Sequence, residues 1–300
     1  MNPIEYIFSF FQLLFAFITS GTFFMLVIFP GLLTMLLAAA AIIWFERKAL
    51  AKIQLRVGPQ YAGRIGGILQ PVADFAKLIF KESIIPKRAD RFLFQIAPLV
   101  IVTFAATTVT VIPIGPNLVI ADLEFGLLFA FAIAAILPAL AFLTAWASNS
   151  VYPFLGGLRA LLQLVAYEIP LWLSAIGVVI MSSTLNMTGI VYAQSGYWFI
   201  LLQPLGALVF YIALLAELER IPYDLPEAEP EIVTGYMSEY SGMNFGLLML
   251  SQYLKLYIGS LMFTTLFLGG WLMPAFIPSF IPSFVWVFIK VSIVASLLIL

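Results

Sequence analysis

Seven long apolar runs constrain this chain more than any other feature of its sequence. Each is about as long as the roughly 20 residues that a helix needs to cross a bilayer. Hydrophobic residues make up 63% of the 300 residues, against about 45–50% in soluble domains. We predict an all-α, polytopic membrane protein, a helix bundle with a single transmembrane domain over residues 1–300. The predicted spans are Thr22–Phe45, Phe92–Ile112, Phe125–Ala147, Leu158–Ser182, Phe199–Ala216, Phe245–Leu268 and Phe284–Leu300.

The two ends of the chain carry further expectations. Ile7–Ile18 is apolar but short, so we expect it to extend the first span or to lie in the membrane interface. The first ten residues lack a basic segment and a small-residue cleavage site, so no cleavable signal peptide is expected. The sequence ends inside the run Phe284–Leu300, and we expect the natural protein to continue beyond it.

The chain has no cysteine and no histidine. Disulfides, thiolate-ligated iron–sulfur clusters, histidine-ligated haem and the usual zinc sites are therefore excluded. We expect no metal site and no redox centre of its own. Any electron transfer must use cofactors that other subunits hold.

Lysine and arginine are concentrated in one loop. Of the 14 in the chain, ten lie in the basic loop, residues Glu46–Arg91. The positive-inside rule places this loop in the cytoplasm. Alternation of the spans then places residues 148–157 and the acidic loop, Glu217–Gly242, on the same side, so the basic and acidic loops can be electrostatic partners. The ten are Arg47, Lys48, Lys52, Arg56, Arg64, Lys77, Lys81, Lys87, Arg88 and Arg91.

The basic loop contains two features. Over Ile68–Lys81, Asp74 and Lys77 share one side at helical spacing and apolar residues share the other, which predicts an amphipathic helix on the membrane or against a partner, or else a solvated connector. Arg56 and Lys77 can bind an anionic group or pair with Glu46, Asp74 or Glu82. The plainer alternative is topogenic charge in contact with lipid headgroups.

A second motif, Leu155–Pro170, lies inside a span. Arg159, Gln163 and Tyr167 fall on one helix face, and Glu168 falls roughly opposite. An acid at this depth is a functional hypothesis by default. The alternative is an internally paired, structural glutamate.

The acidic loop gathers carboxylates in a chain that is otherwise poor in charge. Three prolines disfavour a continuous helix there, and Arg220 is the only base. Crowding and burial raise carboxylate pKa values, so these groups can hold and pass protons, or they can dock a basic subunit. Lys255 and Lys290 lie within spans, where each can relay protons or snorkel. Four aromatic residues are predicted to be interfacial anchors: Trp146, Tyr152, Trp271 and Trp286. The acids are Glu217, Glu219, Asp224, Glu227, Glu229, Glu231 and Glu239.

These blocks together resemble the family of the membrane subunit at the junction of respiratory complex I, which comprises mitochondrial subunit 1 and its bacterial counterparts. The resemblance runs from Glu46 to Trp271. It rests on an E-R-K helix exit, R-x-G-P, L-Q-P-x-A-D-x-x-K-L-x-x-K-E, G-G-L-R-A, Y-E-I-P, and D-L-P-E-A-E followed by E-Y-S-G. The P-E-A-E variant is similar to the prokaryotic and plastid branches.

The resemblance implies eight spans and a subunit of a proton-pumping oxidoreductase. It implies a quinone chamber formed with hydrophilic-arm subunits that carry the terminal iron–sulfur cluster, neighbouring antiporter-like membrane subunits, and no nucleic-acid partner. The residues that it assigns to the quinone chamber are Glu46, Arg47, Arg56, Asp74, Lys77, Arg159, Tyr167 and Arg220. Those that it assigns to proton coupling are Glu168, Glu217, Glu219, Asp224, Glu227, Glu229 and Glu231.

Two departures and several alternatives remain. Pro230 stands where many relatives carry Glu, Ser or Gln, and Ser251-Gln252-Tyr253 stands where mitochondrial relatives have Ala-Glu-Tyr. NADH, ferredoxin and a reduced deazaflavin all stay open as electron donors. We expect a prokaryotic cell membrane, with the thylakoid or mitochondrial inner membrane as alternatives. The rival functions are a subunit of an energy-converting hydrogenase, a secondary transporter and a structural anchor.

Overall fold

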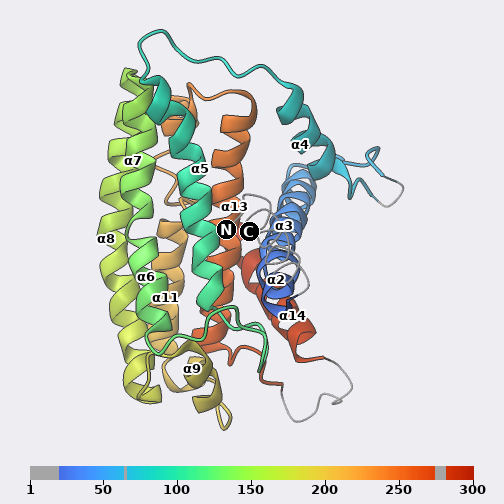
Figure 1. The fold of residues 1–300 in the computed structure, drawn as a ribbon, viewed down its shortest axis with the longest axis vertical. Helices are drawn as coiled ribbons and strands as arrows, with labels where there is room; N and C mark the ends of the chain where they lie inside the picture. Colours follow the sequence, from blue (N-terminus) through green and yellow to red (C-terminus); the bar gives the residue numbers. More distant parts are fainter. Residues whose placement is uncertain (1–19, 64–65, 274–281) are drawn as a thin grey trace, which may run out of the picture.

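The computed structural model describes residues 20–63, 66–273 and 282–300. Every regular element in these ranges is a helix (Figure 1), which confirms the all-α prediction. The predicted segment Ile7–Ile18 and Arg64 lie outside the described residues. The elements are α2 (Gly21–Phe23), η1 (Phe24–Ile28), α3 (Leu32–Ile53), α4 (Gln70–Phe80), α5 (Arg91–Thr108), η2 (Val109–Val111), α6 (Gly126–Ala134), α7 (Leu137–Ser148), α8 (Val151–Ser182), α9 (Met187–Ala193), α10 (Phe199–Leu202), α11 (Pro204–Glu217), α12 (Glu229–Ile232), η3 (Gly235–Met237), α13 (Gly242–Phe267) and α14 (Ser283–Ile299).

Helices occupy all seven predicted spans. Four helical segments, 24–53, 91–111, 126–148 and 151–182, are long and apolar enough to cross a membrane. α11 and α14 are shorter apolar helices. α13 has sufficient length, with 26 residues, but it carries Gln252 and Lys255 in its middle. The protein is therefore a multi-pass membrane protein in which one helix brings polar side chains into the bundle.

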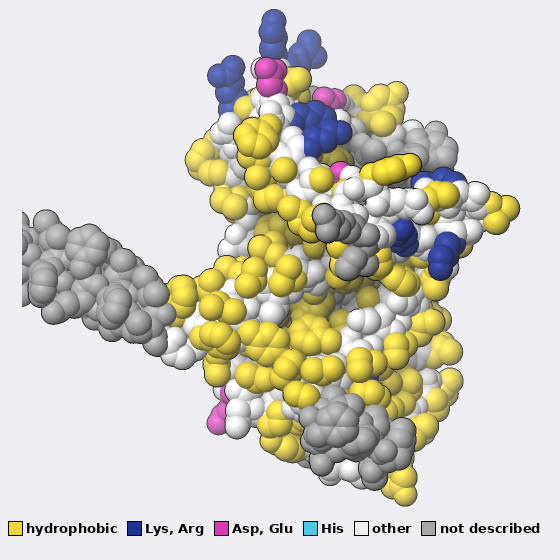
Figure 2. Space-filling model, turned by 90° about the vertical axis from the view of Figure 1, so that its right-hand side faces the viewer, with side chains coloured by type: hydrophobic (Ala, Val, Ile, Leu, Met, Phe, Trp, Pro, Cys, Tyr) yellow, Lys and Arg dark blue, Asp and Glu magenta, His cyan; other side chains and the backbone are white. Residues whose placement is uncertain are grey.

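α8 shows how the sequence produces a lipid-facing surface. Leu162, Ile169, Leu173 and Ile180 recur at helical spacing and are all exposed. The opposite face of α8 is buried and contains small and polar residues, including Ser174. Figure 2 shows the same pattern on the side of α3, α4 and α14, where hydrophobic side chains form a belt around the middle of the molecule. The apolar exterior is suited to hydrocarbon rather than water.

Prolines and glycines mark several helix boundaries. α7 and α11 each have a proline in the first turn, where the missing N–H costs no helical hydrogen bond. The first predicted span is interrupted before Leu32, and α3 then continues through Ile53, eight residues beyond the predicted end at Phe45. Residues 46–53 are mostly good helix formers, and the chain first meets a helix breaker at Gly58-Pro59. Glu46 and Arg47 therefore belong to the last turns of α3.

The helices alternate in direction, so the three polar loops meet at one end of the bundle (Figure 1). Most Lys and Arg side chains in view in Figure 2 lie at this end. α4, within the predicted range Ile68–Lys81, lies there against α3 and α13. Much of its apolar surface, including Phe75 and Phe80, is exposed, which suits an interfacial or partner-facing helix.

Lys290 on α14 has a structural role at the opposite end. Its Nζ donates hydrogen bonds to the carbonyl oxygens of Leu268, Gly270 and Leu272 at 2.6, 2.8 and 2.9 Å. These acceptors follow the C-terminus of α13, where a helix presents unpaired carbonyls and partial negative charge. The buried ammonium does not snorkel but forms a cap that ties α14 to α13, and its predicted relay role stays a prediction.

Trp271 corrects another expectation. It is buried and packs edge-to-face on Tyr192, with ring centroids 5.4 Å apart. It belongs to the core and does not anchor the interface. Trp146 and Tyr152 are exposed, as interfacial anchors require.

Candidate functional site

The acidic loop is held against the bundle by close backbone contact. A Cβ on Gly156 of α8 would lie 2.7 Å from the Cα of Gly235, so only glycine fits there. Gly235 itself has φ +57° and lies too close to the carbonyl oxygen of Pro226 for a side chain. The hydroxyl of Tyr240 donates to the carbonyl oxygen of Thr144 at 3.0 Å. These contacts fix the loop in one position over α7 and α8.

The centre of the site is the carboxylate network, defined as Glu219, Glu227, Tyr236, Gln252 and Lys255. Glu219 is only 4% exposed. The Tyr236 hydroxyl donates to Glu219 Oε2 at 3.3 Å, and Lys255 Nζ lies 3.8 Å from Glu219 Oε1. Gln252 Nε2 donates to Glu227 and, at 3.4 Å, to the Tyr236 hydroxyl. The amide of Gln252 thus links the Glu227 carboxylate to the Tyr236 phenol, which bonds the Glu219 carboxylate.

The surroundings of Glu227 and Tyr236 favour the protonated forms of these two groups. Burial raises the pKa of the Glu227 carboxyl, and the neighbouring charge of Glu219 raises it further, against the opposing hydrogen bond from Gln252. Burial and the same two carboxylates keep the pKa of Tyr236 well above its usual value. Glu227 can therefore gain or lose a proton closer to neutrality than an exposed glutamate does.

A small cavity extends from the network into the bundle. It has a volume of about 50 Å³ and is lined by Glu217 at the end of α11, by Lys255, by Thr108 and by apolar residues. Oε2 of Glu217 is buried and has no hydrogen-bond partner among the described residues. A buried water needs at least about 10–15 Å³ and polar partners. The cavity is large enough for water between the carboxylate and the ammonium.

A second set of charges connects the acidic loop to α3. Arg220 Nη1 donates to Glu46 Oε1 at 2.5 Å, and Nη2 donates to Oε2 at 3.3 Å. The Arg220 guanidinium also lies 5.5 Å from the ring centroid of Tyr253 on α13. On the neighbouring face of α3, Arg47 forms an ion pair with Asp74 of α4. The basic and acidic loops do meet. The pair that joins them consists of Arg220, the only base of the acidic loop, and Glu46, an acid of the basic loop.

The α8 motif meets the acidic loop on another side. Arg159 Nη1 lies 2.5 Å from Glu231 Oε2 in an exposed ion pair. Gln163 Nε2 donates to the carbonyl oxygens of Ala216 and Tyr223 at 2.9 and 2.7 Å. The ring of Tyr167 packs edge-to-face on that of Tyr223, with centroids 5.1 Å apart. This motif supports the loop.

The remaining predicted site residues are dispersed. Glu168 is half-buried on α8, close enough to Glu217 to interact electrostatically. Arg56 is exposed and donates to Gln54 at 2.6 Å, and Lys77 is exposed on α4. Asp224 is half-buried in the loop. The side chain of Glu229 lies outside the described residues.

The structure adds residues that the sequence did not single out for a site. Tyr236 gave no signal, because a tyrosine in a loop is common. Gln252 had been noted only as the replacement of an acid, and Lys255 only as an isolated buried base. Their spacing of three residues on one helix puts them on one face, which is the signal that could have joined them.

An open cleft of about 480 Å³ lies at the same end of the molecule. Arg47, Arg56, Gln60, Tyr61 and Gln70 supply its polar lining. Ligand sites commonly measure about 300–1,000 Å³ and place a few donors against apolar surface. Guanidinium and amide donors beside an aromatic ring can bind a ligand that presents oxygen acceptors.

The comparison with known protein families agrees with this arrangement. The model of a family described as NADH dehydrogenase matches residues 24–300. The match begins at η1 and includes every element that carries the network, the ion pairs and the cleft. The chain belongs to the NADH dehydrogenase family, the family of the complex I membrane subunit known in mitochondria as subunit 1.

Proposed function

We propose that this complex I-type subunit forms one wall of a quinone chamber and couples quinone reduction to proton translocation. The observation that carries the proposal is the junction at Glu219 and Arg220. Arg220 pairs with Glu46 on α3, and Glu219, its neighbour in the chain, belongs to the carboxylate network and lies near Lys255 of α13. A charge change beside α3 and α4 is thus one residue away from the buried carboxylate network.

The quinone supplies two-electron, two-proton redox chemistry when it is bound. In this proposal the headgroup binds in the cleft of about 480 Å³, where Arg47, Arg56, Gln60 and Gln70 offer N–H donors to its carbonyl oxygens. The Glu46–Arg220 pair holds its charges in a half-buried position. A neutralised Glu46 would leave the Arg220 guanidinium to attract the acids beside it, and Glu227 would then release its proton more readily.

Uncovered apolar side chains at the loop end support docking of a hydrophilic arm. Leu55, Tyr61, Phe80 and Ile84 are all strongly exposed there, although the apolar belt lies lower on the molecule. Exposed apolar surface of this kind marks an interface with another protein or with a membrane, and this proposal assigns it to a protein partner. We assign the hydrophilic-arm subunits that carry the terminal iron–sulfur cluster to this surface, antiporter-like subunits to the membrane, and the loop end to the cytoplasm.

The test compares proton translocation with electron transfer in the assembled complex. We expect Glu219→Gln and Lys255→Met to lower the number of protons translocated per quinone reduced. Glu82→Gln removes an exposed acid at the same end and is the control. Unchanged stoichiometry in both network variants would refute the coupling role. Hydrogen evolution without quinone reduction would identify the subunit of an energy-converting hydrogenase instead.

A further inference from the structure

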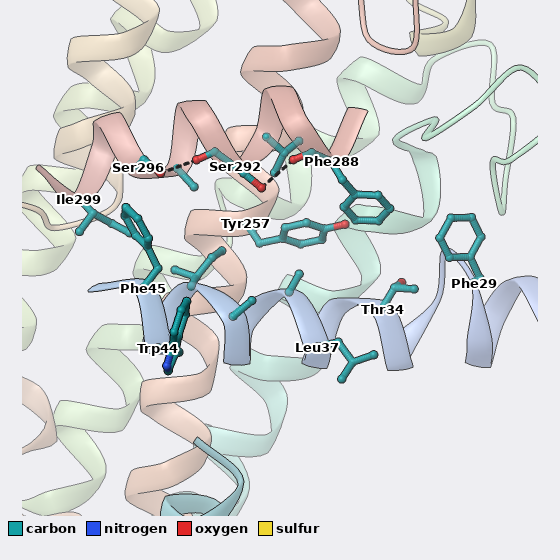
Figure 3. Close-up of a pocket in the computed structure, with 15 residues that line it drawn as sticks. Phe29, Thr34, Leu37, Trp44, Phe45, Tyr257, Phe288, Ser292, Ser296 and Ile299 are labelled. Atoms are coloured by element: carbon teal, nitrogen blue, oxygen red, sulfur yellow. Dashed lines mark hydrogen bonds between the residues drawn. The ribbon is translucent and has the colours of Figure 1, made fainter. Parts of the chain in front are cut away.

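An apolar crevice runs between α3 and α14, away from the carboxylate network. Its volume is about 600 Å³. Figure 3 shows α3 on one side, α14 on the other, and the ring of Tyr257 from α13 between them. Small side chains, including Ala38 and Ala295, line both walls and keep the crevice open.

The two ends of the crevice differ in chemistry. One end is closed by aromatic rings: the Phe29 centroid lies 5.2 Å from that of Phe284 and 6.2 Å from that of Phe288. The other end lies beside Phe45 and Ile299 (Figure 3), where α3 continues into the basic loop. A ligand in the crevice therefore has a dry, blind end and an end near cationic groups.

Helical periodicity places two lysines above the open end. Thr34, Ala38, Ala41 and Phe45 line the crevice at alternating steps of four and three residues. The same alternation continues to Lys48 and Lys52, so both belong to this stripe of α3. Neither forms an ion pair with a described residue.

The length of the crevice matches one membrane leaflet. Thr34 and Phe45 are eleven residues apart, which is about 16 Å along a helix. Half of the hydrocarbon core of a bilayer is about 15 Å. Lys48 and Lys52 then follow at about 5 and 10 Å above Phe45, which is where the headgroup of a lipid begins.

We propose that this crevice is a binding site for an anionic glycerophospholipid. One acyl chain lies between α3 and α14 with its end at Phe29 and Phe288, and Lys48 and Lys52 bind the phosphate. Basic residues above apolar surface between membrane helices are suited to such headgroups. A phosphate supplies the counterion that Lys48 and Lys52 lack among the described residues.

The test uses the assembled complex in nanodiscs and a phosphatidylglycerol that carries a photoreactive diazirine at the end of one acyl chain. We expect mass spectrometry to locate the crosslinks at the blind end, on the peptides that contain Phe29 and Phe288. Lys48→Gln/Lys52→Gln should lower the yield at limiting probe about thirtyfold, which corresponds to about 2 kcal/mol for two lysines near the surface. Lys87→Gln, an exposed lysine at the same end, is the matched control.

Two further variants make the result decisive. Ala38→Phe fills the crevice and should abolish the crosslinks, and Ala295→Leu serves the same purpose if the first variant fails to assemble. Equal labelling by a phosphatidylcholine probe, or full labelling of the double lysine variant, would overturn the proposal.

The Tyr257 hydroxyl has no hydrogen-bond partner among the described residues. Loss of labelling in Tyr257→Phe together with displacement by a neutral benzoquinone would assign the crevice to a quinone and also overturn it.

Discussion

Replacing Arg220 by methionine tests the connection between the acidic loop and α3. The Arg220 and Glu46 side chains are 22% and 13% exposed, so the pair is mostly shielded from water. Both carboxylate oxygens accept a hydrogen bond from the guanidinium. Methionine keeps most of the apolar length of the side chain but leaves Glu46 as an uncompensated charge.

The expected cost follows from this geometry. Removal of one partner of a buried ion pair destabilises a protein by about 3–5 kcal/mol, mainly because the other charge stays buried and unpaired. Partial exposure places Arg220→Met at the lower end, about 3 kcal/mol. Glu46→Gln/Arg220→Met removes both charges and should recover about 2 kcal/mol of that loss, since replacing both partners is often nearly neutral.

The assay is a double-mutant cycle on the purified complex. The free energy is derived from the denaturant concentration at which this subunit loses its native tryptophan fluorescence. Arg159→Met, which breaks an exposed pair with Glu231, is the control and should change stability by less than about 1 kcal/mol. If the losses from Glu46→Gln and Arg220→Met simply add in the double variant, the two side chains do not interact and the proposed junction is refuted.

Three further perturbations test other parts of the structure. Glu227 has a raised pKa in the folded protein, so the wild type should lose stability relative to Glu227→Gln as the pH rises toward neutrality. The loss should begin at about pH 4.3, the usual glutamate pKa. A stability difference between the two proteins that does not change with pH would contradict this shift. Lys290→Met should lower the free energy of unfolding by about 3 kcal/mol, because three carbonyls lose a charged donor, without lowering quinone reduction per assembled complex; a change below about 1 kcal/mol would show that the cap is dispensable. Gly156→Val should displace the acidic loop at Gly235 and lower both assembly and proton translocation, and normal values for both would show that the close contact is absent.

The sequence was most informative about the spans and the grouping of the loops. Each predicted apolar run contains a helix, because a helix that faces lipid needs a long stretch of apolar residues and such a stretch is visible in the sequence. The sequence was less informative about which charged residues pair. The basic and acidic loops were expected to attract through their majority charges, whereas the pair that joins them is Glu46 with Arg220. The net charge of a loop determines its long-range attraction to another loop. A buried ion pair depends instead on whether two individual side chains of opposite charge come into contact.

The carboxylate network was visible only in part. Its acids stood out because charge is rare in this chain, and Pro222 and Pro226 correctly indicated that no continuous helix crosses the loop, which contains the short helices α12 and η3. Tyr236 and Gln252 carry no charge, so composition and hydropathy gave no reason to associate them with Glu219. Their contacts depend on the turn of the loop over α8 and on the rotation of α13, which no local pattern specifies.

The backbone at Glu219 explains how neighbouring residues serve two sites. Glu219 has φ +55°, in the left-handed region that costs a residue with a Cβ about 1–2 kcal/mol. In an extended strand, neighbouring side chains also point to opposite sides. The chain turns directly after α11, however, so Glu219 and Arg220 are separated by the turn and not by a strand. Here the turn lets Glu219 face Tyr236 and Lys255 while Arg220 faces Glu46. Since each contact holds one side of the same turn, loss of either should loosen the other, and the coupling between the two sites requires no moving element larger than this turn.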